Sequence, residues 1–223
     1  MRIAFCQGLE SGTVHRGMSV LRSIGVGVIC LWLGGCAFAG MGATTPPETF
    51  NLAAPTLAAG SYKRWPVQLT VLRPTAMRAL DTDRIVVMAP GGRLSYFDDA
   101  AWSDRLTSLV QSRIVEAMQD SKAFGAVLTT QDRIEGDYTL ALEIRDFQME
   151  VGGGQQSAVV TFFAKLTQEK LGKVIATKEF TARGPAPNDN PASSVAVLQS
   201  DFNQVAQSLV DWLASARKSR SAA

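Results

Sequence analysis

The chain has 223 residues, 22 of them basic and 20 acidic, so its formal net charge at pH 7 is only +2. Such a balance gives no support to nucleic-acid binding, which relies on basic side chains that neutralise phosphates. All three cysteines and the single histidine lie at or before residue 36. A chain cut before Cys36 therefore has no histidine and only one thiol, which excludes an internal disulfide.

The first apolar segment has the layout of a secretory signal. Arg16 and Arg22 precede a run of about ten mostly apolar residues that stops at Leu33. This run is too short to span a bilayer, which needs roughly 20 apolar residues. The four residues 33–36, Leu-Gly-Gly-Cys, then resemble the bacterial lipoprotein box, where signal peptidase II cuts before a cysteine that carries a diacylglyceryl thioether.

We therefore predict a signal peptide over residues 1–35 and lipidation of Cys36 by diacylglyceryl and N-acyl (palmitate-type) groups, with no other cofactor. A normal-looking signal begins at Met18, where we expect translation to start. An uncleaved membrane anchor and an ordinary signal peptide are the alternatives, and either would still export the domain. Ala37 stands where an aspartate favours inner-membrane retention in Gram-negative lipoproteins, so we expect a lipid-anchored protein on the periplasmic face of the outer membrane.

The rest of the chain divides into a lead (residues 36–61), one domain and a tail. Residues 36–61 are rich in Ala, Gly, Thr and Pro, which predicts a flexible tether with a candidate edge strand at 49–53. Residues 62–216 contain no internal repeat and predict a single domain. Residues 217–223 predict a disordered basic tail.

Hydrophobic alternation and turn residues predict a series of strands. They cover residues 67–72, 84–88, 93–97, 126–130, 138–151, 157–167 and 173–181. In the strand 138–151 the apolar positions change parity after Ile144, which predicts a bulge near Arg145 and Asp146. The glycine triplet 152–154 predicts a hairpin turn.

Two segments change to helical periodicity. Asp98 or Asp99 is the expected N-cap of the first helix, and Asn190 followed by Pro191 is a start signal for the second. Their apolar stripes are Trp102, Leu106, Leu109, Val110, Ile114, Ala117 and Met118, and Val195, Leu198, Phe202, Val205, Leu209 and Leu213. The predicted fold class is α+β, with a mostly antiparallel sheet packed by two amphipathic helices in an α/β sandwich.

Catalytic chemistry has few candidates in this chain. Without histidine or a free thiol, Ser-His-Asp and Cys-His arrangements cannot form, and a zinc site would need carboxylates alone. The sequence also contains no P-loop motif for nucleotide binding. Asp98 and Asp99 could act as general acid and base, but capping is the favoured interpretation. The remaining carboxylates read as ordinary turn or strand-face charges: Asp81, Asp83, Glu143 and Asp146. Tyr96, Phe97 and Trp102 could form a binding surface, with core packing favoured.

Several of these features resemble the ABC-type transport auxiliary lipoprotein component family, which includes the paraquat-inducible protein C lipoproteins. The family pattern has an R-I-V strand, a strand ending in tyrosine, a tryptophan before a leucine-rich helix, and a closing phenylalanine. These places are held here by Arg84, Ile85, Val86, Tyr96, Trp102, Leu106 and Phe124. Residues 49–53 resemble the family's first strand, whereas residues 73–82 depart from its "L-D-R-P" element.

The resemblance implies a non-catalytic accessory subunit of an ABC transporter for lipids. Its partner would be a protein with a mammalian-cell-entry (MCE) domain, its anchor would lie in the outer membrane, and phospholipid contact and a homo-oligomer stay open. No catalytic, cofactor or metal residue is carried over from the family. A free-standing lipid carrier is the alternative, although the same apolar residues are needed to fill the core. A carboxylate-based hydrolase is a third and weaker hypothesis.

Overall fold

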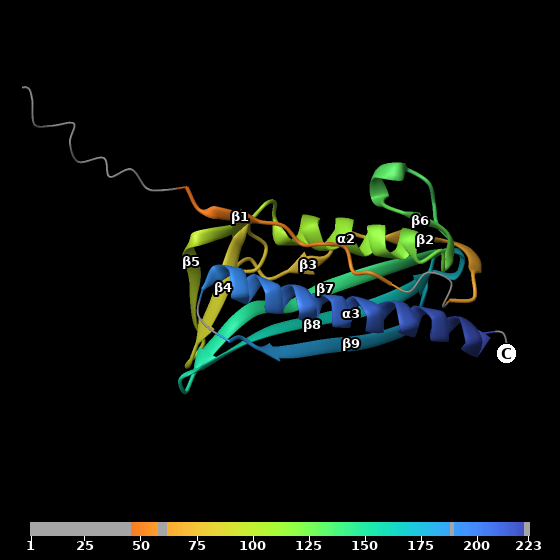
Figure 1. Ribbon diagram of the computed structural model, residues 1–223. Helices are drawn as coiled ribbons and strands as arrows, with labels where there is room; N and C mark the ends of the chain where they lie inside the picture. The colour runs from red at the N-terminus through yellow and green to blue at the C-terminus, as the bar shows by residue number, and fades with distance from the viewer. Residues whose placement is uncertain (1–45, 58–61, 188–189, 221–223) are drawn as a thin grey trace, which may run out of the picture. The chain divides into compact units, whose positions relative to one another are not determined.

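The computed structural model describes residues 46–57, 62–187 and 190–220, with side chains placed up to residue 216. The predictions for the signal peptide, for Cys36 and for the last three residues lie outside this part of the chain. Residues from Pro46 onward form one compact unit. Within it, a nine-stranded sheet carries two long helices, as the predicted α+β class requires (Figure 1).

The sheet is organised around one long strand, β7 (Tyr138–Gly152). Its other strands are β1 (Glu48–Phe50), β2 (Trp65–Val71), β3 (Thr75–Ala76), β4 (Arg84–Ala89), β5 (Arg93–Trp102), β6 (Phe124–Leu128), β8 (Gln155–Gln168) and β9 (Lys173–Pro185). Along one side of β7 runs the antiparallel pair β8 and β9. Along the other side, β2, β3 and β4 each pair in parallel with a different part of β7.

These pairings refine the predicted topology. The long ladders of β7 with β8 and of β8 with β9 are antiparallel, as predicted, and so is the β4–β5 hairpin. The parallel pairs were not predicted, because short strands joined by long crossovers carry no local sign of their partners. The result is a mixed sheet in which β2 extends to β6 and β4 extends through β5 to β1.

The predicted bulge in β7 is confirmed. The register with β8 shifts between Ile144 and Asp146, so that Arg145 has no direct partner in the ladder. Leu140, Leu142 and Ile144 before the shift, and Phe147 and Met149 after it, are all buried in the core. The extra residue thus keeps a single apolar face along the whole strand.

Both helices lie on the same side of the sheet, α2 (Leu106–Asp120) above the β2–β6 region and α3 (Pro191–Arg220) along β8 and β9 (Figure 1). Asn190 caps α3 as predicted, since its Oδ1 accepts a hydrogen bond from the Ser193 amide at 2.7 Å. All six predicted stripe positions of α3 are buried. The backbone of residues 217–220, predicted as the start of the tail, continues the helix.

The predicted start of the first helix was wrong. Asp98, Asp99 and Trp102 belong to strand β5, and α2 begins only at Leu106. The Trp102 amide donates to the Asp83 carbonyl at 2.6 Å, and Trp102 pairs with Phe50 of β1. Sheet pairing therefore extends the strand past two residues whose local preference favours a helix cap.

The predicted tether was too long, because residues 46–57 belong to the folded unit. Strand β1 pairs in parallel with β5, which confirms the edge strand slightly upstream of its predicted place. Leu52 and Leu57 are only 1% and 6% exposed. The Gln199 side chain of α3 accepts from the Ala53 amide at 2.7 Å and donates to the Ala53 carbonyl at 3.1 Å. The buried leucines and this pair of hydrogen bonds hold the segment against the domain, although its composition is typical of a flexible tether.

Aromatic side chains fill the space between the sheet and α3. The rings of Phe147, Phe162 and Phe202 are fully buried, with centroids 6.2–6.4 Å apart. Trp102 packs edge-on against Phe147 at 5.8 Å. Such ring contacts add to the burial of large apolar surface. The interior between these elements is therefore occupied by the protein's own side chains.

Helix α3 packs tightly against strand β9 at Gly184. A Cβ atom at this position would lie 2.8 Å from Cγ1 of Val197 and 2.9 Å from Oδ1 of Asp201. The Gly184 amide donates to Asp201 Oδ2 at 2.9 Å. Any side chain here would force the Val197 and Asp201 side chains, or the helix that carries them, to shift.

We expect Gly184→Ala to destabilise the domain by about 1–3 kcal/mol, the usual cost of overpacking a tight contact. Urea unfolding followed by circular dichroism measures the change. Thr177→Ala, at an exposed position of the same strand, serves as the control and should shift the free energy of unfolding by less than about 0.5 kcal/mol. Equal stability of the two variants would contradict the packing argument.

The buried carboxylate of Asp201 predicts a pH effect. Burial raises the pKa of Asp201, an effect that the Gly184 hydrogen bond and the Arg183 charge oppose. The folded chain thus holds the proton more tightly than the unfolded chain, and this contribution to stability is lost as pH rises through the raised pKa. Asp201→Asn keeps an oxygen acceptor without ionising. We expect the stability of the variant relative to the parent to be more favourable at pH 7 than at pH 3.5, measured by urea unfolding; an equal difference at both pH values would overturn this assignment.

Candidate functional site on the open face of the sheet

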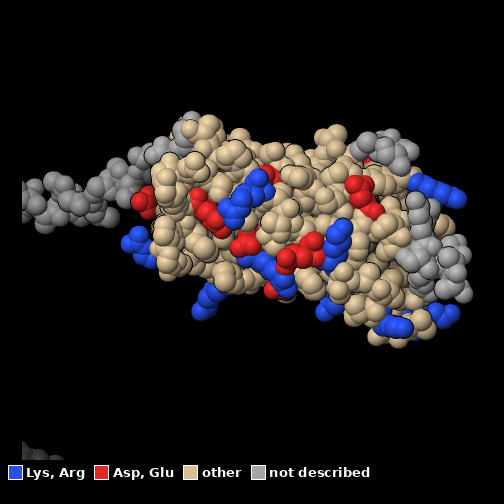
Figure 2. Space-filling view, turned by 90° about the horizontal axis from the view of Figure 1, so that it is seen from below, with Lys and Arg blue, Asp and Glu red and all other residues tan. Residues whose placement is uncertain are grey.

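The face of the sheet opposite to the two helices is the candidate site. Figure 2 views the molecule from this side and shows acidic and basic side chains gathered along its middle. Those that form ion pairs come from β7 and β9, where alternate residues point away from the core. We call this surface, from Glu143 to Arg183 on β7, β8 and β9, the open face.

A three-residue ion cluster marks the centre of the open face. Arg145, freed from the ladder by the bulge, forms ion pairs with Glu143 at 3.6 Å and with Glu179 of β9. Its guanidinium also lies over the Phe163 ring, 4.4 Å from the centroid. The pKa of Arg145 is raised, chiefly by its hydrogen bond with Glu179. The cluster ties the central strand to the outer strand over the intervening β8.

Beneath these charges lie polar and apolar side chains that are almost inaccessible. Gln148, Val159 and Thr161 are 2%, 3% and 5% exposed, although neither described helix covers them. Gln148 Nε2 donates to Asp146 Oδ1 at 3.2 Å, and the Thr161 and Thr181 hydroxyls are 3.2 Å apart. The long side chains of the ion pairs shield this layer. The open face is therefore an ordered surface of paired charges.

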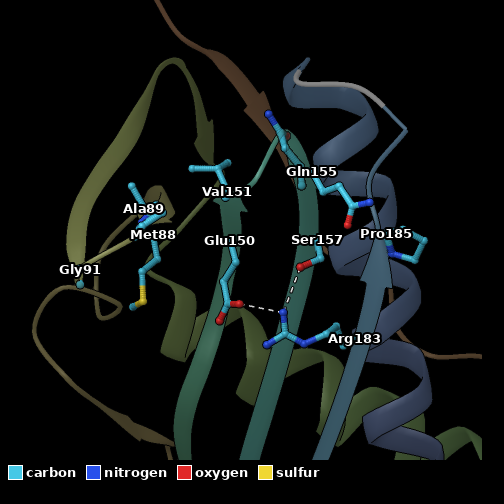
Figure 3. Close-up of a pocket in the computed structure, with 13 residues that line it drawn as sticks. Met88, Ala89, Gly91, Glu150, Val151, Gln155, Ser157, Arg183 and Pro185 are labelled. Atoms are coloured by element: carbon cyan, nitrogen blue, oxygen red, sulfur yellow. Dashed lines mark hydrogen bonds and ion pairs between the residues drawn. The ribbon is translucent and has the colours of Figure 1, made fainter.

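One end of the open face is hollowed into a pocket of about 740 Å³. Its walls come from the tips of the β4–β5 and β7–β8 hairpins and from the end of β9 (Figure 3). On its floor, Arg183 Nη1 donates to Glu150 Oε2 at 2.7 Å and to Ser157 Oγ at 3.0 Å. The pKa of Arg183 is raised, chiefly by the Glu150 hydrogen bond. A cation and an anion thus stand side by side in a solvent-accessible hollow.

The carboxylates considered as catalytic candidates do not converge. Asp98 and Asp99 are exposed on β5, whereas Glu143 and Asp146 lie on the open face as strand-face charges. Asp81 accepts from the Thr107 hydroxyl at 2.8 Å and pairs with Arg105 at 3.2 Å, which joins the loop before β4 to the start of α2. Within the described residues, no group of His, Cys, Asp and Glu could hold a metal ion.

The three aromatic candidates mostly serve packing. Trp102 is 3% exposed and belongs to the core. Tyr96 and Phe97 are half-buried and pack against the core, and the Arg84 guanidinium lies 4.1 Å from the centre of the Tyr96 ring. Core packing, which we favoured from the sequence, accounts for all three.

Glu150 and Arg183, the pair on the floor of the pocket, were not among the site residues predicted from the sequence. They are 33 residues apart in the chain and meet only because β7 and β9 flank the same strand. The glycine-containing hairpins were a partial signal in the sequence, because Gly91 and Gly92 of the first and Gly152 and Gln155 of the second line the pocket. In the described part of the chain, no helix is both long and apolar enough to cross a membrane.

Comparisons with known proteins agree with this architecture. A sequence model of the ABC-type transport auxiliary lipoprotein component family matches residues 50–210. An uncharacterized protein of Bradyrhizobium diazoefficiens is 29% identical over 173 residues, which are 78% of this chain and 46% of that protein. The chain thus spans less than half the length of this relative.

Solved structures share the fold. Protein XCC0632 of Xanthomonas campestris, from the DUF330 family, has a TM-score of 0.72 and 25% identity, over 79% of this chain and 100% of that one. Another solved protein, itself uncharacterized, has a TM-score of 0.59 and 13% identity, over 76% of this chain and 99% of that one. The second likeness shows the fold alone.

Proposed function

Because this chain belongs to the ABC-type transport auxiliary lipoprotein component family, we propose that it is the non-catalytic accessory subunit of an ABC/MCE-type lipid transport system. In this role it docks an MCE-domain protein in the periplasm and aids the passage of lipid between the two membranes. The observation that carries the proposal is the one-sided domain, whose helices cover one face of the sheet and leave an ordered, charged face open.

The open face supports docking for two physical reasons. Its ion pairs are held in place across three strands, so a partner meets preformed charges, and little side-chain entropy is lost on binding. Complementary charges on a partner would then fix its register, while like charges would repel it. The bulge residue Arg145 stands at the centre of this arrangement.

The anchor completes the proposal. Lipidation at Cys36 would hold the domain on the outer membrane, while residues 37–45 precede the first folded strand. Two or more acyl chains give stable attachment, whereas one chain gives only marginal binding. The transporter would thereby be tied to the outer membrane through a domain that needs no chemistry of its own.

The free-standing lipid carrier is the second candidate. It would need an apolar cavity between the sheet and the helices. The contacts among Phe147, Phe162 and Phe202 fill this space beside α3, and packed interiors hold few voids. These contacts weigh in favour of the docking subunit. The hydrolase hypothesis has less support still, since its best candidates, Asp98 and Asp99, are exposed strand residues.

Docking is tested by charge reversal on the open face. Arg145→Glu would place a carboxylate between Glu143 and Glu179 without touching the core, so a partner complementary to the paired charges would meet three carboxylates instead. We expect at least about tenfold lower recovery of the MCE-domain protein, which corresponds to about 1.4 kcal/mol. The measurement is affinity capture of the mature lipoprotein from detergent-solubilised envelopes, with quantitative mass spectrometry.

Arg113→Glu is the matched control, because Arg113 forms a 2.6 Å ion pair with Glu116 on α2, on the other side of the sheet. It should leave recovery unchanged, with both variants folded by circular dichroism. Failure of the parent to recover any MCE-domain protein would contradict the proposed function. Equal recovery with Arg145→Glu would remove the open face from the docking interface.

Anchoring is tested by Cys36→Ser. The variant lacks the thiol that receives the diacylglyceryl group, so we expect a folded domain that is released from the outer membrane or stays unprocessed. Membrane fractionation with a carbonate wash and immunoblotting measures this. A variant that is cleaved, active and still in the washed outer membrane would show that attachment does not depend on this cysteine.

A further inference from the structure

The pocket at the end of the open face has the composition of a ligand site. It is about 740 Å³ in volume, within the roughly 300–1,000 Å³ range of small-molecule sites. Its apolar wall is formed by side chains such as Met88, Pro90, Val151 and Pro185, and its floor by Arg183 and Glu150. The two charged side chains are 52% and 35% exposed, so both are accessible from the pocket.

The charges on the floor restrict which ligand can bind. A purely anionic group would have to compete with Glu150 for the guanidinium, and a purely cationic group would be repelled by Arg183. A ligand that carries both charges close together can satisfy both side chains. A phosphate accepts hydrogen bonds from an arginine in a strong, charge-assisted geometry. An ammonium group can in turn donate to the carboxylate.

We infer that this pocket binds a zwitterionic phosphoethanolamine headgroup, with its phosphate on Arg183 and its ammonium on Glu150. Gln155, Gln156 and Ser157 add polar groups along one wall, and the apolar side chains of Met88 and Val151 contact the glycerol region. The inference rests on the proposed role in lipid transport and names the lipid class that the subunit contacts.

The lining also discriminates against the choline headgroup. A quaternary ammonium has no N–H to donate to Glu150 and is recognised in proteins mainly by aromatic side chains. Among the described residues that line the pocket, none is Phe, Tyr or Trp. Ethanolamine lipids are therefore preferred over both choline lipids and anionic glycerol lipids.

Native mass spectrometry of the detergent-purified mature lipoprotein tests this preference. The protein is mixed with equal concentrations of dihexanoyl phosphatidylethanolamine, phosphatidylcholine and phosphatidylglycerol, and the bound fraction of each is counted. We expect the ethanolamine lipid to bind about tenfold better than the other two. Free phosphoethanolamine should displace it, which separates headgroup recognition from binding of the acyl chains.

Two variants test which charged side chain binds which part of the headgroup. Arg183→Gln should reduce ethanolamine-lipid binding at least about tenfold. Glu150→Gln should remove the preference over phosphatidylglycerol, because the competing carboxylate is gone. Arg113→Gln, in the ion pair on α2, is the control and should bind like the parent. Equal binding of the three lipids by the parent, or unchanged binding by both pocket variants, would overturn the inference.

Partner capture separates this inference from the proposed function. Both readouts are taken on the parent, partner capture from solubilised envelopes and headgroup preference with the purified lipoprotein. Recovery of the partner by a parent that shows no lipid preference would refute the headgroup site and leave the docking function standing. A lipid preference without partner recovery would support the site and contradict the docking function.

Discussion

The extra residue in β7 is the constraint on which the rest of the structure depends. In a regular fifteen-residue strand, the apolar residues of either the first half or the second half would face away from the helices. With the bulge at Arg145, Ile144 and Phe147 both face the core. The same bulge releases the Arg145 side chain to reach Glu143 and Glu179 on the opposite face. A single local irregularity thus completes the core and organises the charged surface.

The sequence predicted the features that depend on neighbouring residues. The parity change in β7, the Asn190 cap and the apolar stripe of α3 are all local patterns, and the structure confirms them. The predicted start of α2 was wrong. Asp98 and Asp99 favour a helix cap locally, but pairing of Trp102 with β1 and its packing on Phe147 stabilise the strand more. Tertiary contacts overrode propensity at that position.

Features formed by residues that are distant in the sequence could not be predicted from local patterns. Residues 50–57 of the lead have a composition typical of a flexible segment. Yet Leu52 is buried, and Ala53 forms a hydrogen bond with Gln199, which lies 146 residues away. The pocket pair of Glu150 and Arg183 likewise exists only once β7 and β9 flank β8. Its residues have ordinary strand-face character in the sequence. The candidate site is therefore a product of topology, whereas the core is largely a product of hydrophobic pattern.

The two sides of the sheet make different contacts, because α2 and α3 cover one side and the open face is the other. On the helical side, the chain before β2 contacts α3 at two points, where Ala53 hydrogen-bonds to Gln199 and Tyr62 hydrogen-bonds to Asp211. Positions 199 and 211 are twelve residues apart, a distance of about 18 Å at the α-helical rise. These two contacts hold the chain that follows the proposed anchor to α3, so tension on the anchor would be carried by them and by the buried Leu52 and Leu57. The open face bears none of these contacts, and a partner could bind there without disturbing the attachment of the lead.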